Sequence, residues 1–335
     1  LCRGTERALQ QLVYKSARSL LSSCAGRLAD SVRSNDPAVL HFHYLVDARF
    51  FLPVFRRLQV PGIVSGYGWD VSLFPTTKLG FARRYLLPIF EEMDLFLAMS
   101  SDMKRDLVAL GCPEKKILVH YYGTDVHRFS YPARKYDHPG PVRLLFVARL
   151  APKKGPDVLV KSLAMLLRSD LPRDFRLTIV GDGPLRGVLE VLVRTHGLRG
   201  RVEFKGHLPY EGRDLVREYQ RADIFILPSQ TANTEKEGIP GTLVEAMASG
   251  LPVISTYHAG IPDVIMSGEN GILVQEGDSR AIADALQQLI VNADLRRKLG
   301  VRAAKHSKKN LNLSARTAEL EAIYDRVSLL KKNGR

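Results

Sequence analysis

Residues 224–256 read IFILPSQTANTEKEGIPGTLVEAMASGLPVIST, and this stretch sets the fold class. A short apolar run at 224–227 precedes a polar loop, and a second apolar run follows at 253–256. Between them, the pattern over about 241–249 predicts a helix, and Gly250 is placed to end it. A strand, a helix and a strand in this order predict two parallel strands joined by a crossover helix.

The same alternation of short apolar and longer amphipathic runs continues along the chain, so parallel sheets are expected in both halves. The further strands expected in the second half are 143–148, 176–180, 202–205 and 271–274. In the first half we expect strands at 39–42, 63–65, 95–99 and 117–121, and helices at 47–58, 79–93 and 101–110. The sequence therefore predicts an α/β protein with two Rossmann-like domains.

A polar stretch marks the expected domain boundary. Residues 130–141 are rich in proline and lack apolar periodicity, which is typical of a linker. We expect an N-terminal domain over 1–135 and a C-terminal domain over 141–312. A charged helix at 313–335 carries an apolar stripe, and we expect it to dock back on the N-terminal domain. Residues 1–35 show a basic helical pattern without a preceding strand, so the N-terminal domain is expected to lack its first strand.

Composition excludes several classes of protein. The 335 residues are 45% hydrophobic and 25% charged, too apolar for a disordered chain and too long for a disulfide-stapled miniature. No run reaches the roughly 18 to 20 apolar residues of a membrane span. The three cysteines lack metal-ligand spacing, so we expect a soluble protein of a reducing, cytoplasmic compartment.

The net charge of +14, from 49 basic and 35 acidic residues, favours anionic partners without choosing among them. The basic residues are dispersed and lack interleaved aromatic residues, so no nucleic acid is expected. Two segments suggest peripheral contact with an anionic membrane: 78–90, KLGFARRYLLPIF, and the basic end at 296–335. The structural alternatives are a crossover helix packed on the sheet and a solvated helical tail.

Glu237 and Glu245 lie eight residues apart across the start of the helix expected at 241–249. Free backbone N–H groups at such a start, here of Ile239, Gly241 and Thr242, form an anion site. A carboxylate on either side of a bound phosphate suits the hydroxyl groups of a sugar nucleotide. The alternative is an ordinary loop-to-helix junction with two surface glutamates.

A second basic element follows the strand expected at 143–148. Arg149 directly follows this strand, and Lys154 and Gly155 come five and six residues after Arg149. Open α/β sheets bind ligands at the carboxyl ends of their strands, and a guanidinium with an ammonium suits a diphosphate. Solvated surface charge is the alternative for each residue taken singly.

Together these segments resemble the retaining glycosyltransferases of family 4 over roughly residues 38–325. The motifs that carry the resemblance stand in the family's order: R-L-x-x-x-K-G at 149–155, V-G-D-G-P at 180–184, F-K-G-H-L at 204–208, A-D-I-F-I-L-P-S at 222–229, the two glutamates followed by A-M-A-S-G-L-P at 246–252, and N-G-I-L-V at 270–274. The resemblance implies the GT-B fold, with two facing Rossmann-like domains and the donor cleft between them. Exopolysaccharide and colanic-acid-type transferases are the most similar members.

The resemblance also implies roles for individual residues. Arg149 and Lys154 would neutralise the donor diphosphate, Glu237 would contact the donor sugar near the reacting carbon, and Glu245 would bind the ribose hydroxyls. The remaining donor-binding residues it implies are Gly238, Ile239, Gly241, Thr242, Leu243, His207 and Leu208. On the acceptor side it implies His43, Tyr67 and Asp70, and Tyr67 stands where many members have histidine.

The expected reaction is transfer of a hexosyl group from a UDP- or GDP-sugar to a glycan or lipid-linked acceptor of surface polysaccharide biosynthesis. No D-x-D occurs, so no metal is expected. The spacing of Gly181, Gly183 and Gly187 is not the dinucleotide fingerprint, so no cofactor is expected either. Two alternatives stay open: the same fold with a small soluble acceptor, as in sucrose- or trehalose-type synthesis, and a nucleotide-sugar-binding protein without turnover. We expect the protein in the cytoplasm, in peripheral contact with the inner face of the plasma membrane where the acceptor is lipid-linked.

Overall fold

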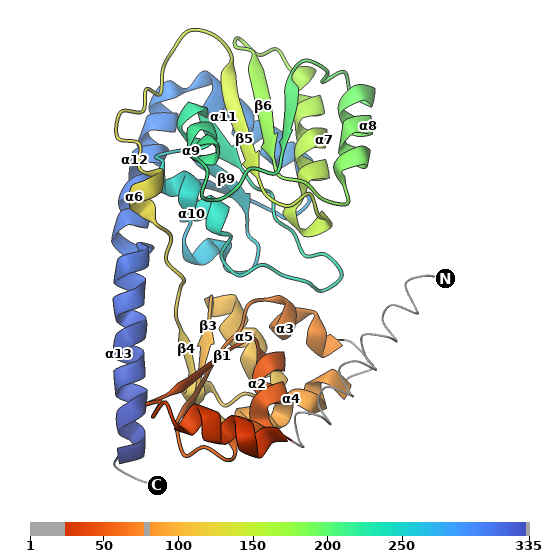
Figure 1. Cartoon of the computed structure of the whole chain (residues 1–335). Helices are drawn as coiled ribbons and strands as arrows, with labels where there is room; N and C mark the ends of the chain where they lie inside the picture. The colour runs from red at the N-terminus through yellow and green to blue at the C-terminus, as the bar shows by residue number, and fades with distance from the viewer. Residues whose placement is uncertain (1–23, 77–80, 333–335) are drawn as a thin grey trace. The chain divides into compact units, whose positions relative to one another are not determined.

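The computed structural model describes residues 24–76 and 81–332, and the chain divides into two compact units (Figure 1). Unit 1 holds the described residues up to Met99, together with Met103–His120 and the chain from Glu319 onward. Unit 2 holds Ser100–Asp102 and Tyr121–Ala318. Each unit is built on its own parallel sheet, which confirms the prediction of two Rossmann-like α/β domains.

The sheet of unit 1 has four parallel strands in the order in which they occur in the chain. They are β1 (Leu40–His43), β2 (Gly62–Ser65), β3 (Leu95–Ala98) and β4 (Ile117–Val119). Residues 24–33 are helical and precede β1. The expectation that an earlier strand is lacking concerns residues that lie partly outside the described part of the chain.

The helices of unit 1 pack on this sheet through apolar faces. They are α2 (Leu45–Phe55), α3 (Trp69–Ser72), α4 (Phe81–Glu92) and α5 (Ser101–Leu110), with 3-10 turns η1 (Phe74–Thr76) and η3 (Glu114–Lys116). In α4, Leu86 and Ile89 are fully buried, while Arg83 and Arg84 are exposed. The described part of segment 78–90 is therefore a crossover helix whose apolar face is in the core, and the segment's start lies outside the described residues.

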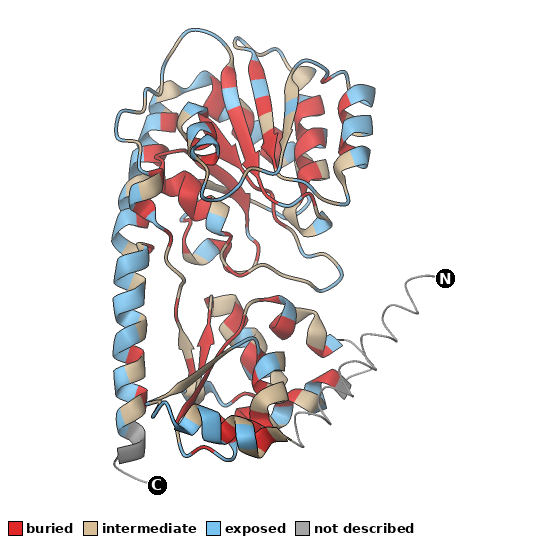
Figure 2. Ribbon diagram, viewed as in Figure 1, coloured by how far each residue is buried: buried red, intermediate tan, exposed pale blue. Residues whose placement is uncertain are grey.

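The last helix, α13 (Leu313–Lys332), packs on unit 1 through part of its apolar side chains. Ile323 and Val327 are almost fully buried, and they pack with Ile63 and Leu97 of the unit 1 sheet. Most of its other positions for which burial is described are exposed (Figure 2). Among the residues that the structure describes, no helix is both long enough and apolar enough to cross a bilayer.

The sheet of unit 2 has six parallel strands in the order β10-β9-β8-β5-β6-β7. They are β5 (Val142–Val147), β6 (Phe175–Val180), β7 (Val202–Gly206), β8 (Ile224–Ile226), β9 (Val253–Thr256) and β10 (Ile272–Val274). The chain adds β6 and β7 on one side of β5, then returns to add β8, β9 and β10 on the other. The topological switch point, where open α/β sheets bind their ligands, therefore lies between β5 and β8.

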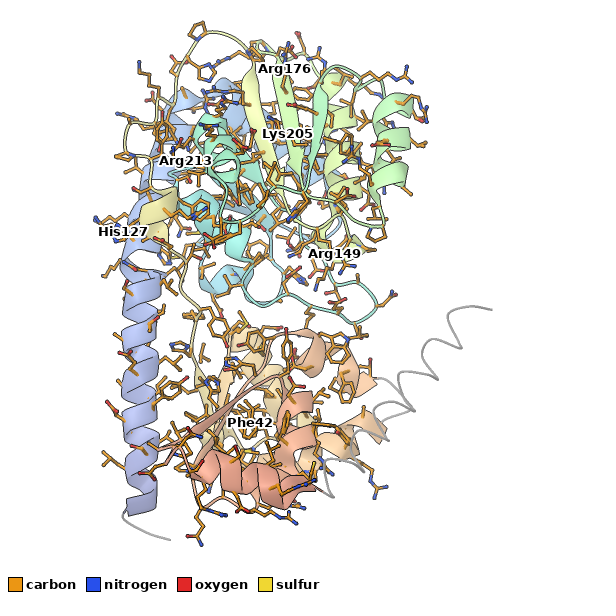
Figure 3. The ribbon with its side chains drawn as sticks, viewed as in Figure 1. Phe42, His127, Arg149, Arg176, Lys205 and Arg213 are labelled. Carbon is orange, nitrogen blue, oxygen red and sulfur yellow. The ribbon has the colours of Figure 1, made fainter. Side chains whose placement is uncertain are left out.

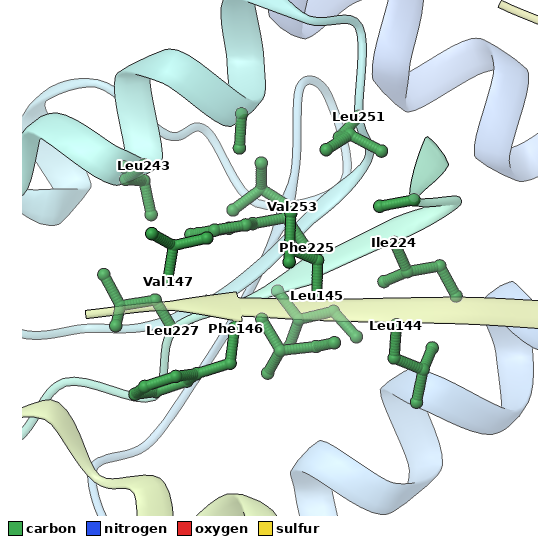
Figure 4. Packing of buried hydrophobic residues seen from close by; sticks show 14 of the residues in the cluster. Leu144, Leu145, Phe146, Val147, Ile224, Phe225, Leu227, Leu243, Leu251 and Val253 are labelled. Carbon is green, nitrogen blue, oxygen red and sulfur yellow. The ribbon is translucent and has the colours of Figure 1, made fainter. Parts of the chain in front are cut away.

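Both faces of this sheet are covered, so the central strands β8 and β9 are buried at every position. Its longer helices are α7 (Pro156–Leu167), α8 (Arg186–Thr195), α9 (Arg213–Arg221), α10 (Gly241–Ala248), α11 (Ser279–Val291) and α12 (Ala293–Asn310); the short ones are α6 (Val126–Phe129), η4 (Pro152–Lys154) and η5 (Ile261–Asp263). Figure 4 shows the central packing, in which Phe146 of β5 and Phe225 of β8 are both fully buried.

The proline-rich stretch 130–141 is attached to unit 2 by hydrogen bonds. The Arg134 guanidinium donates to the carbonyl oxygens of Ser249, Ala222 and Tyr219, and burial lowers its pKa to about 10. The Tyr136 hydroxyl donates to the Gly250 carbonyl at 2.8 Å. The change between the two units lies upstream of this stretch, between residues 120 and 121.

Candidate functional site

The carboxyl edge of the unit 2 sheet gathers the charged residues that the sequence singles out. Arg149 follows β5, and η4 next along the chain carries Lys153 and Lys154. Figure 3 shows Arg149 at the opposite end of the sheet from Arg176, which lies near the amino end of β6. The Arg149 side chain is exposed, so its guanidinium is accessible to an anionic ligand.

Lys154 and Glu237 meet at the switch point. Lys154 follows β5, Glu237 lies in the loop after β8, and Lys154 Nζ is 2.7 Å from Glu237 Oε1. Their side chains are 16% and 10% exposed. The contact lacks hydrogen-bond angles, so this buried oxygen has no hydrogen-bond partner among the described residues. Because an ammonium has three N–H donors, Lys154 can hold Glu237 and bind a phosphate oxygen at the same time.

Two glycines allow the loops at this edge to approach each other closely. Gly155 has φ +62°, and a Cβ there would overlap the carbonyl oxygen of Pro228, which follows β8. Gly181 has φ +125°, and a Cβ there would overlap the carbonyl oxygen of Ala148. Glycine is required at both positions by backbone conformation and by space. The first glycine of V-G-D-G-P thus brings the loops after β5 and β6 together.

Helix α10 begins at Gly241, close to where the sequence places it. Leu243 N–H donates to Pro240 O at 3.1 Å, and the Leu243 side chain is fully buried in the core. This amide is therefore already engaged, and Gly241 and Thr242 are the first-turn amides left for a ligand. Ile239 is half-buried against the same core, and so places its side chain away from an anion at the helix start.

Glu245 lies about one turn into α10, not two turns as expected, and it is not a surface residue. It is 6% exposed, and its Oε2 accepts a hydrogen bond of 2.6 Å from the hydroxyl of Tyr219, which is fully buried. Burial raises the pKa of both groups. The other carboxylate oxygen, Oε1, faces Gly241. One oxygen of Glu245 is thus fixed by the protein and the other is directed toward the start of α10.

The loop after β7 adds an aromatic surface. His207 is exposed and Leu208 packs partly against the core. Tyr210 is 46% exposed, and the Arg128 guanidinium lies 5.0 Å from its ring centroid. Burial and then the nearby Glu245 charge raise the pKa of Tyr210, so its hydroxyl is within electrostatic reach of that carboxylate.

Sequence reasoning missed several side chains at this edge, among them Tyr219, His258 and Glu276. His258 follows β9 and is fully buried, and Glu276 follows β10. The position of both residues just after a parallel strand was a usable signal, because those strand ends lie at the ligand-binding edge. Tyr219 offers no such signal, since it lies inside α9 and meets Glu245 only through tertiary packing.

In unit 1, His43 and Tyr67 form a pair through His43 Nδ1 and the tyrosine hydroxyl. Asp70 is fully buried; its two oxygens accept from Leu45 N–H at 2.8 Å and from Tyr67 N–H at 2.9 Å. Burial raises the Asp70 pKa. Asp70 therefore holds the backbone around Tyr67, while the exposed His43 and the half-buried Tyr67 present polar groups. The Tyr44 ring lies 4.6 Å from the Tyr67 ring.

Comparison of the sequence with protein families gives matches over most of the chain. Residues 133–306 match the family described as glycosyl transferases group 1, and residues 5–128 match glycosyltransferase family 4. The chain is 38% identical over 295 residues to the putative colanic acid biosynthesis glycosyltransferase WcaL of Escherichia coli K12, covering 85% of this chain and 69% of that protein. It is 35% identical over 258 residues to the amylovoran biosynthesis glycosyltransferase AmsK of Erwinia amylovora, covering 76% of this chain and 61% of that protein.

Solved structures show the same fold at low sequence identity. The Alr3699/HepE protein of Anabaena in complex with UDP superposes with a TM-score of 0.77 at 17% identity, over 90% of this chain and 82% of that chain. Sucrose-phosphate synthase of Thermosynechococcus elongatus has a TM-score of 0.74 at 20% identity, over 92% and 79%. The fold is therefore GT-B, as the sequence predicted.

Proposed function

Because this chain belongs to the glycosyl transferases group 1 family, we propose that it transfers a sugar from a nucleotide-sugar donor to a glycan or lipid-linked acceptor. The proposed donor is a UDP- or GDP-sugar, and the proposed process is surface polysaccharide biosynthesis. Relatives named for amylovoran and colanic acid biosynthesis support that process. The chain spans 61% of the length of the Erwinia relative, so the activity of the whole protein is part of the proposal.

The observation that carries the proposal is the ion pair of Lys154 and Glu237 at the switch point of unit 2. An ammonium group, which suits a phosphate, lies beside a carboxylate oxygen that has no hydrogen-bond partner among the described residues. The first-turn amides of Gly241 and Thr242 add positive potential to the same edge. Glu245, on the same helix, offers one oxygen toward a hydroxyl group.

In the proposed reaction the bond from the anomeric carbon to the phosphate oxygen breaks, and a bond to the acceptor oxygen forms on the same face. The acceptor proton passes to the leaving phosphate. Negative charge grows on that phosphate in the transition state, so the fixed cations Arg149 and Lys154 stabilise the transition state more than the ground state. Glu237 contacts the donor sugar and Glu245 the ribose hydroxyls. A covalent sugar adduct on Glu237 would contradict this route.

A binding screen tests the donor site. The unfolding temperature of the chain is measured with UDP-glucose, UDP-galactose, UDP-N-acetylglucosamine, GDP-mannose and GDP-fucose, since a ligand of the native state raises it by mass action. We expect at least one of them to bind. Glu245→Gln, which retains an acceptor for Tyr219, should weaken that binding about 10- to 100-fold, as expected for a lost charged hydrogen bond.

Glu190→Gln is the matched control, because Glu190 is an exposed residue of α8 whose ion pair with Arg186 is on the surface. We expect it to bind the donor as the unaltered chain does. Equal binding by the Glu245 and Glu190 variants would contradict the ribose assignment. Binding without transfer or donor hydrolysis would indicate a nucleotide-sugar-binding protein instead of a transferase. Turnover is expected to persist in excess chelator, since the proposed charge stabilisation comes from Arg149 and Lys154.

We also propose that the protein works in the cytoplasm, in peripheral contact with an anionic membrane that presents the acceptor. Exposed cations on one helix of unit 2 support this contact. They lie on α12 and are Arg297, Lys298, Arg302, Lys305, Lys308 and Lys309. Such a group attracts acidic lipid headgroups.

A further inference from the structure

A buried imidazole lies directly beneath the loop that carries Glu237. His258 is fully buried where the chain leaves β9. Its Nε2 is 3.0 Å from the backbone nitrogen of Glu237, and its Nδ1 is 2.6 Å from Oε1 of Glu276. The imidazole thus links a backbone group of the loop to a carboxylate that follows β10.

These two contacts fix the proton on the ring. A backbone N–H only donates, so Nε2 of His258 must accept and carry no proton. The proton is then on Nδ1, where it is donated to the Glu276 carboxylate. A ring protonated on both nitrogens has no acceptor for Glu237 N–H. The geometry therefore selects a single tautomer of a neutral imidazole.

Glu276 is itself held in place from the other end of the loop. Its Oε2 accepts from Thr231 N–H at 2.7 Å. Burial opposes its ionisation, but the hydrogen bonds from Thr231 and His258 hold its pKa below the usual range. Between these anchor points the chain reverses through Asn233 and Thr234, both with positive φ. One imidazole and one carboxylate thus hold the loop at residue 231 and at residue 237.

Two further contacts of this loop come from the segment after β5, on the opposite side of the switch point. Lys153 pairs with Glu235 at 2.5 Å, and Lys154 pairs with Glu237 at 2.7 Å. Glu237 therefore has two contacts. Its backbone N–H donates to His258, which follows β9, and its side chain pairs with Lys154, which follows β5. A backbone displaced from His258 would move the carboxylate relative to Lys154.

We propose that His258, oriented by Glu276, is a positioning residue that sets the Glu237 carboxylate for contact with the donor sugar. The inference rests on the proposed function, because it assumes that Glu237 faces the sugar of a nucleotide-sugar donor. It assigns His258 no contact with the nucleotide. Loss of His258 should therefore weaken recognition of the sugar and slow its transfer, while binding of the nucleoside diphosphate alone is retained.

Two substitutions separate the two nitrogens of the ring. His258→Gln places an amide oxygen near the position of Nε2, so it can accept from Glu237 N–H. His258→Asn places its amide near the position of Nδ1, so it can contact Glu276 but leaves Glu237 N–H without an acceptor. Dissociation constants are measured for UDP and UDP-glucose, or for GDP and GDP-mannose, according to which pair the unaltered chain binds, together with the rate of donor hydrolysis.

We expect His258→Asn to bind the nucleoside diphosphate as before, to bind the nucleotide sugar about 10- to 100-fold more weakly and to lose hydrolysis by a similar factor. Glu237 N–H then lacks its acceptor, so the carboxylate shifts and loses a charged hydrogen bond to the sugar. His258→Gln should lose markedly less on both measures. Equal losses of nucleotide-sugar binding and hydrolysis in the two variants would overturn the role of His258 but leave the proposed function standing. Absence of nucleotide-sugar binding by the unaltered chain would overturn the proposed function and the inference with it.

A second pair of variants gives the answer if neither His258 variant folds. Glu276→Gln keeps one amide oxygen, which can accept from either Thr231 N–H or His258 Nδ1–H, whereas Glu276→Leu removes both acceptors. We expect the glutamine variant to retain part of the preference for nucleotide sugar over nucleoside diphosphate, and the leucine variant to lose it. The same preference in both variants would overturn the inference.

Discussion

Tyr219 determines how Glu245 presents its carboxylate. The tyrosine is fully buried in α9, and its hydroxyl donates to one carboxylate oxygen at 2.6 Å. A carboxylate that is only 6% exposed would be costly without such a donor. The hydrogen bond leaves the second oxygen to face Gly241, where a ribose hydroxyl is expected. A buried tyrosine thus sets the orientation of the carboxylate that we propose binds the donor.

In unit 1, the surroundings of the partly buried His41 imidazole change its pKa. Its Nδ1 is 2.7 Å from the Tyr324 hydroxyl, and its Nε2 is 2.8 Å from Ser65 Oγ. Burial first, and then the charges of His43 and His120, lower its pKa from 6.5 to about 4. The folded protein therefore keeps this ring neutral over a range in which the unfolded chain protonates it.

We predict that unit 1 loses stability as the pH falls from about 6.5 to about 4, because the unfolded state binds the His41 proton first. His41→Gln, whose uncharged amide lies near the position of Nε2 and keeps a partner for Ser65, should show a smaller loss over this range. Denaturant unfolding followed by the fluorescence of Trp69, the single tryptophan and a residue of unit 1, measures it. Equal pH dependence in both proteins would contradict the assignment.

At the scale of elements, the turn between η4 and α7 connects the fold to the site. Gly155 adopts φ +62° against the carbonyl oxygen of Pro228, and it directly follows Lys154. The close approach of these two loops fixes the position of η4 relative to the loop after β8. The position of the Lys154 ammonium thus depends on a residue that has no side chain.

We predict that Gly155→Ala destabilises unit 2 by at least about 1–3 kcal/mol, from the positive φ and the overlap with Pro228 O. It should also weaken nucleotide binding, because η4 must move. Thermal unfolding and calorimetric titration with UDP measure the two effects.

Gly187→Ala is the matched control, since Gly187 lies in the first turn of α8 with no atom near the position of a new Cβ. Alanine there should stabilise the helix by about 0.5–1 kcal/mol and leave UDP binding unchanged. A Gly155→Ala variant as stable as this control would contradict the prediction, because it would show that the loop moves to accommodate the new Cβ without loss of stability.

Elements with a strong apolar pattern were predictable, and those made by contacts were not. The strand at 253–256 was predicted at its observed bounds, and the other strands begin and end within two residues of expectation. Short elements such as α6 were missed, because four residues carry no periodicity; α6 is capped by the Asp125 side chain. In the site, Lys154 and Glu237 were singled out from their positions in the sequence. The hydrogen bond between Tyr219 and Glu245 could be found only in the tertiary structure.

At the scale of the whole molecule, exposed basic residues gather on particular helices. Helix α4 exposes Arg83 and Arg84, and α12 exposes a longer basic face that includes Lys305, Lys308 and Lys309. Exposed cations of this kind bind acidic lipid with a strength that falls as salt rises. The +14 net charge alone does not distinguish the two surfaces.

We predict that the protein sediments with vesicles containing phosphatidylglycerol and not with vesicles of phosphatidylcholine alone, and that high salt releases it. Replacing Lys305, Lys308 and Lys309 by glutamine should weaken this binding on the order of 100-fold, at about 1 kcal/mol per cation. Replacing Arg83 and Arg84 by glutamine is the comparison. A larger loss in the α4 variant would move the contact to that helix, and binding that ignores salt would contradict an electrostatic contact.

Unit 1 is completed by the last stretch of the chain, while unit 2 is continuous from Tyr121 to Ala318. Ile323 and Val327 of α13 cover Ile63 and Leu97, which precede them by more than two hundred positions. During synthesis the amino-terminal sheet therefore leaves the ribosome with one apolar patch uncovered, and all of unit 2 emerges before that patch is closed. The usual order, in which the first domain is finished first, is reversed here.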